Sequence, residues 1–435
     1  MEIFKNPNFV KLFFAALSSQ MGTTIGNMAF AFFMLEHFSS QPYYATLAEL
    51  MYSLPTIFVF FLVGVVADRF DRKKVAENCD WIRAGLSVVL FGALFLNSIP
   101  LIFFILFLRS AVTKFFFPAE NSLVQGILKK EQYAQAAGLN QILFSLFMVF
   151  GVGLGAVAYK TIGIHGAVVI DFISFVVSAL LIRACRIPKG ARLPNGKLNW
   201  KDVNVKSSIS DFKEGILYIL QNKLLAVIIF GFFVFGFVTG GFAILPMFTM
   251  KYKLSPENYE WYASFFAVSL GIGLLAGSAL ATVIEKKIKP YIMMIVPIFI
   301  ASALIVLLGL TDHLWVYLTA VFFIGICLGP VNIAIGGWIP KLVNPKLMGR
   351  VSGWIDPLMM TAQSLTLGLI ALVFPKFIET IDYIYYGMAT VIFLVFIFYL
   401  LTLPKLSEQA DREEKRKKLE ESKVKKTMNT GPING

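Results

Sequence analysis

The chain has 435 residues, of which 57% are hydrophobic and 15% aromatic. A soluble domain could not hydrate so apolar an exterior, so this composition excludes a soluble globular protein. The net charge of +13 could indicate nucleic-acid binding, but the basic residues lie in short gaps between apolar runs and in one tail. We therefore predict a multi-pass protein of the cell membrane, in contact with lipid, with no nucleic-acid partner.

Twelve apolar runs are long enough to cross a bilayer core of about 30 Å, which requires about 20 residues per helix. They lie near 9–35, 43–67, 76–97, 100–122, 134–159, 165–185, 223–250, 259–284, 290–310, 314–338, 349–375 and 381–403. Lysine and arginine are frequent in the connections that follow even-numbered runs and rare in those that follow odd-numbered runs. Both termini and the middle loop are therefore predicted to be cytoplasmic.

The spans fall into two groups of six, which predicts an N-terminal half, a cytoplasmic linker, a C-terminal half and a charged tail. The boundaries are 1–185, 186–222, 223–403 and 404–435. In the linker, apolar residues share one helical stripe and predict an amphipathic surface helix: Ile209, Phe212, Ile216 and Ile219. We expect the tail to be a mobile or frayed helix that is dispensable. Paired six-helix halves are typical of transporters that alternate access.

The stretch Gly64–Lys74, GVVADRFDRKK, places six charges in eleven residues directly after an apolar run. In its simplest interpretation, such a loop only marks the cytoplasmic side of the membrane. The spacing GxxxDRxxRKK, however, resembles motif A of the major facilitator superfamily. The matching residues are Gly64, Asp68, Arg69, Arg72 and Lys73. Asp71 departs from that motif, because most members have glycine there.

Further stretches are similar to the macrolide-efflux and enterobactin-exporter branch of that superfamily. They are DWIR at 80–83, FLRSAVTKFFFPAENSLV at 107–124, FKEGILYILQNKLL at 212–225 and LMGRVSG at 347–353. The resemblance implies an all-α facilitator fold of twelve transmembrane helices in two pseudo-symmetric halves. It also implies alternating access, as an exporter of a hydrophobic or amphiphilic small molecule (drug-like, macrolide-like or siderophore) in exchange for protons or another ion.

The resemblance also implies a conformational latch at the motif A loop. Asp68 would face the start of span eleven, near residues 348–352, where free backbone amides favour an anion. By the same family logic, Arg72 would reach Glu120 at the cytoplasmic end of span four. We assign Asp80 and Arg83, at the cytoplasmic end of span three, to the same cluster of charges.

Ionisable residues inside the spans are costly in hydrocarbon and are therefore functional candidates. Arg109 lies roughly 13 Å into span four at 1.5 Å per residue, and it matches the arginine of the superfamily's motif B. Asp171 lies at a similar depth in span six and could neutralise Arg109, either as a structural pair or as a proton-coupling element. Glu49 and Asp356, each about two turns inside a span, are proton-carrier or cation-recognition candidates, with helix-packing hydrogen bonds as the alternative.

Polar residues recur every three or four positions along span one, as expected of a surface that lines a cavity. They are Gln20, Thr23, Thr24 and Asn27. A weak internal repeat places Ala137-Gly138 opposite Ser352-Gly353. Gln141 of span five then corresponds to Asp356, which makes Gln141 a further cavity candidate. Hydrogen bonding between helices is the alternative explanation. Gly151, Gly153 and Gly155 of span five resemble the antiporter motif C without its proline, and close helix packing also explains them.

No catalytic or nucleotide-binding motif is present, and the three cysteines have neither disulfide nor zinc spacing. We therefore expect a non-enzymatic protein without metal or cofactor, acting as a monomer on a small-molecule substrate. Two alternatives remain open at this point. One is a lipid or lysolipid translocator of the same fold, and the other is a membrane receptor that does not transport.

Overall fold

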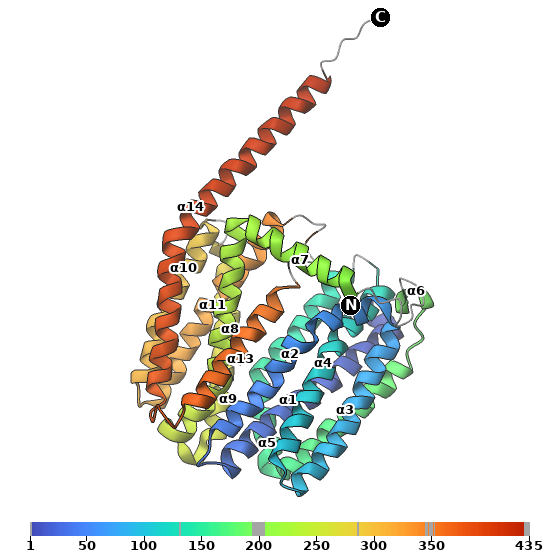
Figure 1. Cartoon of the computed structure of the whole chain (residues 1–435), viewed down its shortest axis with the longest axis vertical. Coiled ribbons are helices and arrows are strands. Elements are labelled where there is room, and N and C mark those ends of the chain that lie inside the picture. Colours follow the sequence, from blue (N-terminus) through green and yellow to red (C-terminus); the bar gives the residue numbers. More distant parts are fainter. Residues whose placement is uncertain are drawn as a thin grey trace, which may run out of the picture.

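The computed structural model describes residues 2–129, 132–193, 205–284, 287–343, 347, 351 and 353–429. Figure 1 shows a bundle of long helices, with the last helix projecting far beyond it. The long helices are α1 (Pro7–His37), α2 (Tyr43–Arg69), α3 (Arg72–Phe95), α4 (Ile99–Ile127), α5 (Tyr133–Arg183), α8 (Lys223–Thr249), α9 (Tyr259–Ile284), α10 (Pro290–Leu310), α11 (Leu314–Leu342), α13 (Ile355–Val373) and α14 (Asp382–Asn429). Shorter elements are η1 (Glu2–Lys5), α6 (Lys189–Arg192), α7 (Val205–Gln221), η4 (Met250–Leu254) and η5 (Pro256–Asn258).

Helix α5 contains two predicted spans in one element of 51 residues. Gly163 interrupts it with a φ of 67°, a left-handed conformation that glycine adopts without steric cost. The chain therefore has a first arm over residues 133–162 and a second arm over residues 164–183. This explains how the predicted spans 134–159 and 165–185 share one helical element.

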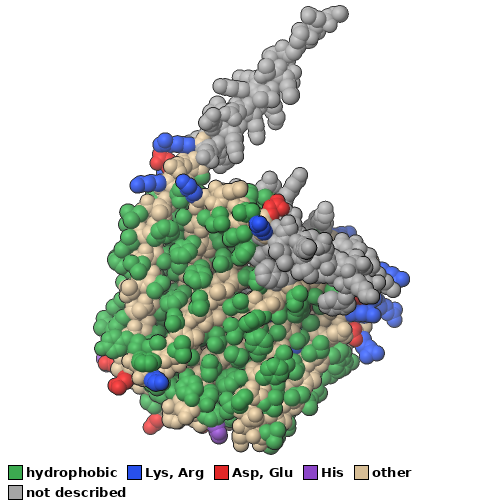
Figure 2. All heavy atoms as spheres, in the orientation of Figure 1, with side chains coloured by type: hydrophobic (Ala, Val, Ile, Leu, Met, Phe, Trp, Pro, Cys, Tyr) green, Lys and Arg blue, Asp and Glu red, His purple; other side chains and the backbone are tan. Residues whose placement is uncertain are grey.

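Nine helices of the described part of the chain are long and apolar enough to cross a membrane. The predicted spans 9–35 and 43–67, which fall on α1 and α2, are not among these nine. The predicted span 134–159 lies on the first arm of α5 and falls only partly within one of the nine, Val149–Arg183. In Figure 2 the visible side of the bundle is covered by hydrophobic side chains, and charged side chains gather toward its two ends. A lipid-facing protein has this distribution.

The long helices pack as two bundles. In one, α1 lies along α5, α3 contacts α4 and α5, and α2 contacts α4. In the other, α9 packs on α11, α8 on α13, and α10 on α11 and α14. The bundles meet through α2 with α13 and α5 with α9. We refer to the end that carries α6, α7 and the projection of α14 as the terminal face, and to the opposite end as the distal face (Figure 1).

The linker and the tail are both helical over the parts that the structure describes. The predicted amphipathic helix corresponds to α7, although the side chains of Ile209 and Phe212 lie outside the described residues. Ile219 of α7 is 2% exposed, and the Tyr218 hydroxyl donates to the Leu342 carbonyl over 3.3 Å, which attaches α7 to the end of α11. The tail, expected to be mobile or frayed, continues α14 as far as Asn429.

Candidate transport site

Asp71, the residue that departs from motif A, caps α3 and holds the linker. Its carboxylate accepts hydrogen bonds from the amides of Lys73 and Lys74 at 3.1 and 3.3 Å, and from Arg192 Nε of α6 at 3.0 Å. Burial acts to raise the pKa of the Asp71 carboxyl, but these hydrogen bonds together with the Arg192 charge outweigh it, so the pKa lies below its ordinary value. An aspartate here therefore provides a side-chain cap and an ionic anchor, which glycine cannot form because it has no side chain.

Lys73 ties the same loop to the end of α5. Its ammonium donates to the carbonyls of Arg183 and Cys185, both at 2.8 Å, where a cation satisfies the free carbonyls of a helix end. A Cβ on Gly126 of α4 would lie 2.6 Å from the Ala191 Cβ, so α6 also packs closely on α4. The loop between α2 and α3 is thus joined to α5 and to the first part of the linker.

The predicted latch falls largely outside the part of the chain that the structure describes. The side chains of Asp68 and Arg69, the surroundings of Gly64, and residues 348–350 and 352 all belong to that remainder. Glu120 is described and 2% exposed, and no ion pair within the described residues joins it to Arg72. The latch therefore stays a prediction.

Arg109 and Asp171 form an ion pair in the interior of the first bundle, between α4 and the second arm of α5. Asp171 is fully buried and Arg109 is 7% exposed. The Ser87 hydroxyl of α3 donates to Asp171 Oδ2 over 2.9 Å, whereas Oδ1 has no hydrogen-bond partner among the described residues. A Cβ on Gly26 would lie 3.3 Å from Asp171 Cγ, so α1 closes over the pair.

Glu49 of α2 is a further buried carboxylate of the first bundle. It is 7% exposed, and its Oε1 atom has no hydrogen-bond partner within the described residues. The hydroxyl of Tyr52, one turn further along α2, interacts electrostatically with Glu49, Arg109 and Asp171. Ser110 of α4 donates to the Tyr52 carbonyl over 2.7 Å, which fixes α2 against α4. Tyr52 therefore links Glu49 to the ion pair of Arg109 and Asp171. The sequence could have indicated Tyr52 by its position three residues after Glu49.

A second buried ion pair lies nearer the terminal face, between Asp80 and Arg83 of α3. The Arg83 guanidinium stands 4.7 Å from the Phe116 ring and 4.3 Å from the Phe175 ring, and it donates to Ser19 at 2.8 Å. Among the described residues these contacts connect Arg83 to Ser19, Phe116 and Phe175, while the side chains of Asp68 and Arg69 lie outside the description. The assignment of Asp80 and Arg83 to the motif A cluster therefore stays a prediction. Phe175 also lies 5.7 Å from Arg109, which places it between the two ion pairs.

Asp356 does not lie two turns inside a span. It occupies the first turn of α13 and is exposed. Pro357 explains the difference, because proline has no amide to donate and is therefore favoured in the first turn of a helix. Asp356 interacts electrostatically with Lys114 of α4, across the two bundles. Lys114 is not among the predicted site residues, although a lysine within an apolar span indicates a functional position.

The predicted polar stripe of α1 divides into two kinds of residue. Thr23 donates to the Ser19 carbonyl over 2.8 Å, and Thr24 packs so closely on Gly151 that a Cβ there would lie 2.4 Å from the Thr24 Cγ2 atom. Gln20 and Asn27 are half-buried, and neither forms a hydrogen bond with another described residue. These two amides remain the cavity candidates of α1, since the side chain of Gln141 lies outside the description.

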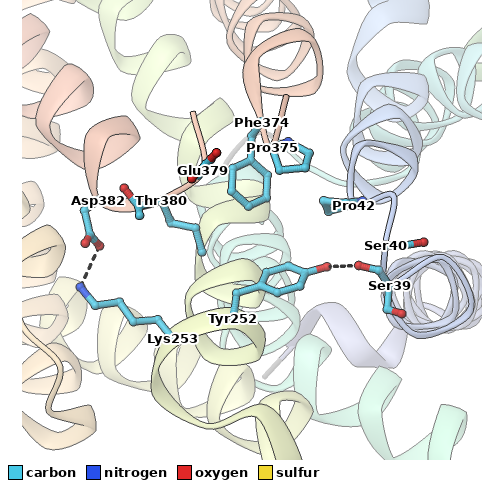
Figure 3. A pocket seen from close by; sticks show the side chains of 11 residues that line it. Ser39, Ser40, Pro42, Tyr252, Lys253, Phe374, Pro375, Glu379, Thr380 and Asp382 are labelled. Atoms are coloured by element: carbon cyan, nitrogen blue, oxygen red, sulfur yellow. Dashed lines mark hydrogen bonds and ion pairs between the residues drawn. The ribbon is translucent and has the colours of Figure 1, made fainter. Parts of the chain in front are cut away.

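The bundles are joined at the distal face. Lys160 at the end of the first arm of α5 pairs with Glu260 of α9 at 3.2 Å, and Lys251 of η4 donates to the Leu35 carbonyl at 2.5 Å. The Tyr252 hydroxyl donates to the Ser39 carbonyl over 3.0 Å, at the edge of a pocket of about 310 Å³ (Figure 3). In Figure 1 the bundles lie close together at this end and diverge toward the terminal face.

Comparison with known proteins agrees with this architecture. Residues 12–367 match the model of the Major Facilitator Superfamily. The chain belongs to this superfamily. A relative described as the uncharacterized MFS-type transporter YkuC of Bacillus subtilis (strain 168) is 72% identical over 394 residues, which cover 91% of this chain and 92% of the relative. The superfamily is not enzymatic, and no cluster of the described residues could hold a metal ion.

More distant comparisons place this facilitator among transporters. Macrolide efflux protein A of Streptococcus pyogenes is 25% identical over 366 residues, which cover 81% of this chain and 86% of that protein. A crystal structure of a POT family transporter in complex with a thioalcohol-conjugated peptide superposes with a TM-score of 0.73 at 12% identity. It covers 91% of this chain and 96% of that one, so the two share the facilitator fold of two six-helix halves.

Proposed function

We propose that this facilitator is a secondary active exporter of hydrophobic or amphiphilic small molecules, such as macrolide-like drugs or siderophores. It exchanges them for protons across the cell membrane, with both termini in the cytoplasm. The buried ion pair of Arg109 and Asp171, linked through Tyr52 to the buried carboxyl group of Glu49, is the observation that carries this proposal. The distant relatives named for macrolide efflux support export and the substrate class.

The chemistry of proton coupling follows from the charges of that site. Arg109 neutralises Asp171 in the ion pair, while one oxygen of the buried Glu49 has no hydrogen-bond partner among the described residues. An unpaired carboxylate is costly in a medium of low dielectric, so this environment favours a carboxyl group that carries a proton. Addition or loss of one proton changes the net charge of these buried groups. This change shifts the equilibrium between the two access states of the transporter.

The direction of access follows from the contacts between bundles. If the terminal face is cytoplasmic, as the positive residues of the loops indicate, then the distal contacts close the outer side. The amides of Gln20 and Asn27 would meet substrate that enters from the cytoplasm or the inner leaflet. Export then requires the distal contacts to break after substrate has bound.

The test uses purified protein in proteoliposomes, with a radiolabelled macrolide as the probe and an imposed pH gradient. We expect flux that depends on the gradient in the parent, and loss of that dependence in Asp171→Asn and Glu49→Gln. Glu408→Gln is a suitable control, since it removes an exposed ion pair with Arg412 on α14 at 2.7 Å. Macrolide flux that is indifferent to the pH gradient would contradict proton coupling.

A further inference from the structure

A groove lies between α1 and the second arm of α5, toward the terminal face. Its volume is about 400 Å³, and it is lined by Val10, Phe14, Leu17, Met21, Val177 and Leu181 together with Lys11 and Ser18. Phe14, Met21 and Val177 keep exposed fractions of 48%, 38% and 41%, so apolar side chains form its walls and remain accessible. No carboxylate lines the groove among the described residues.

The length of the groove corresponds to one leaflet of a bilayer. Val10 and Met21 are eleven positions apart, which is about 16 Å along a helix. Half of a hydrocarbon core of about 30 Å is about 15 Å. A single acyl chain could therefore lie along the groove from the membrane surface to the midplane.

The end of the groove at the terminal face is basic. Lys11 donates to the Ala184 carbonyl over 3.0 Å, and Asn8 exchanges two hydrogen bonds with the Arg186 backbone at 2.8 and 3.0 Å. These contacts fix the end of α5 beside the start of α1. Arg183 and Arg186 are exposed there, and neither side chain has a hydrogen bond or ion pair with another described residue.

We propose that this groove binds one anionic phospholipid. The acyl chain lies along Phe14, Leu17 and Met21, and the phosphate is held near Arg183 and Arg186. An anionic lipid is favoured over a zwitterionic one because cations gather at the open end of the groove and no acid lines it. The proposal concerns the lipid-facing side of the first bundle and is independent of what is exported.

Fluorescence quenching by brominated lipids tests this proposal. The variant Phe14→Trp places a reporter in the groove, and the parent with its six tryptophans supplies the baseline to subtract. In vesicles of phosphatidylcholine and phosphatidylglycerol, one lipid is brominated at a time. We expect brominated phosphatidylglycerol to quench the added Trp about fivefold or more strongly than brominated phosphatidylcholine does. We call this ratio the lipid preference; about fivefold corresponds to about 1 kcal/mol for one basic residue near an anionic surface.

Two comparisons decide the result. Arg183→Gln with Arg186→Gln, in the Phe14→Trp background, should bring the preference close to onefold without breaking a contact between described side chains. Phe393→Trp on α14, where the parent residue is 41% exposed, should show no preference and serves as the matched control. A preference equal at positions 14 and 393, or one that survives the double arginine substitution, would overturn the proposal.

Discussion

Lys160 Nζ and Glu260 Oε2 lie 3.2 Å apart and join the two bundles at the distal face. The Glu260 residue is 5% exposed, whereas the Lys160 side chain is 35% exposed, so water screens the pair from one side. Such a pair contributes up to about 1 kcal/mol. Because it exists only when the bundles meet, that free energy biases the equilibrium between the two access states.

Glu260→Gln should therefore open the distal face more often. We expect a cysteine at position 264, in a background without Cys79, Cys185 and Cys327, to react about two- to fivefold faster with an impermeant maleimide. Ser264 suits this purpose because it is 6% exposed and a Cβ on Gly153 of the other bundle would lie 3.7 Å from its Oγ.

Asp382→Asn is the control for this measurement. It breaks the ion pair between Lys253 and Asp382, 2.7 Å apart at the same face but contained in one bundle. Figure 3 shows this pair at the wall of the distal pocket. Equal labelling rates in the Glu260 variant, the Asp382 variant and the parent would show that Lys160 and Glu260 do not act as a latch.

The ion pair of Arg109 and Asp171 should stabilise the folded protein. A double substitution can separate this structural role from a role in transport. Asp171→Asn leaves a buried guanidinium without a counter-ion, which costs about 3–5 kcal/mol. Arg109→Gln combined with Asp171→Asn removes both charges and should recover most of that loss. Unfolding in detergent, monitored by circular dichroism, measures the stability of the parent, of Asp171→Asn and of the double variant.

Transport by the double variant then distinguishes the two roles of the pair. If the pair couples proton movement to export, the folded double variant has lost flux that depends on a pH gradient. Retention of that flux would show that Arg109 and Asp171 are structural only. A single Asp171→Asn variant as stable as the parent would show that the ion pair does not neutralise a buried charge.

The pairing of Arg109 with Asp171 could be predicted because helix rise fixes the depth of each residue and a charge in hydrocarbon needs a partner. The fold could be predicted for a similar reason, since bilayer thickness sets span length. The link between Glu49 and this pair through Tyr52 could not be predicted, because it depends on how α2 rotates against α4. Asp356 lies closer to a helix start than predicted because Pro357 favours the first turn of α13.

Asp71 shows a different limit. Comparison with motif A reports only that glycine is usual at this position, whereas the physical role of the carboxylate depends on Arg192, which lies 121 residues away in sequence. The local sequence does predict the capping role of Asp71, since aspartate before a helix is a common N-cap. The ion pair with α6 could be found only from the three-dimensional structure.

The Asp71 ion pair makes a defined prediction about pH. Its folded pKa is lower than the ordinary value of about 3.9, so its stabilisation is fully present above that pH and is lost as the pH falls through the folded pKa. Asn caps a helix about as well as Asp, so Asp71→Asn removes the charge alone. We expect a cost of about 1 kcal/mol between about pH 5 and 8, shrinking toward zero below about pH 4.

Thermal unfolding across this pH range measures the difference between parent and variant. Arg192→Gln should show the same loss at neutral pH, and Asp71→Ala should cost about 1 kcal/mol more than Asp71→Asn because the cap is also lost. If the difference in stability between the parent and Asp71→Asn does not change with pH, the ionised Asp71 carboxylate is not the cause of that difference.

The glycines of α5 should differ sharply from one another in their tolerance of alanine. A Cβ on Gly155 would lie 2.3 Å from Met28 Cβ and 3.2 Å from the Ala29 nitrogen, so α1 would have to move. A Cβ on Gly153 would meet Ser264 at 3.7 Å, an ordinary contact. We expect Gly155→Ala to lose about 1–3 kcal/mol by overpacking, while Gly153→Ala is neutral or gains up to about 1 kcal/mol from helix propensity. Thermal unfolding of the two variants in the same detergent makes the comparison, and equal losses would mean that packing between α1 and α5 does not require glycine at position 155.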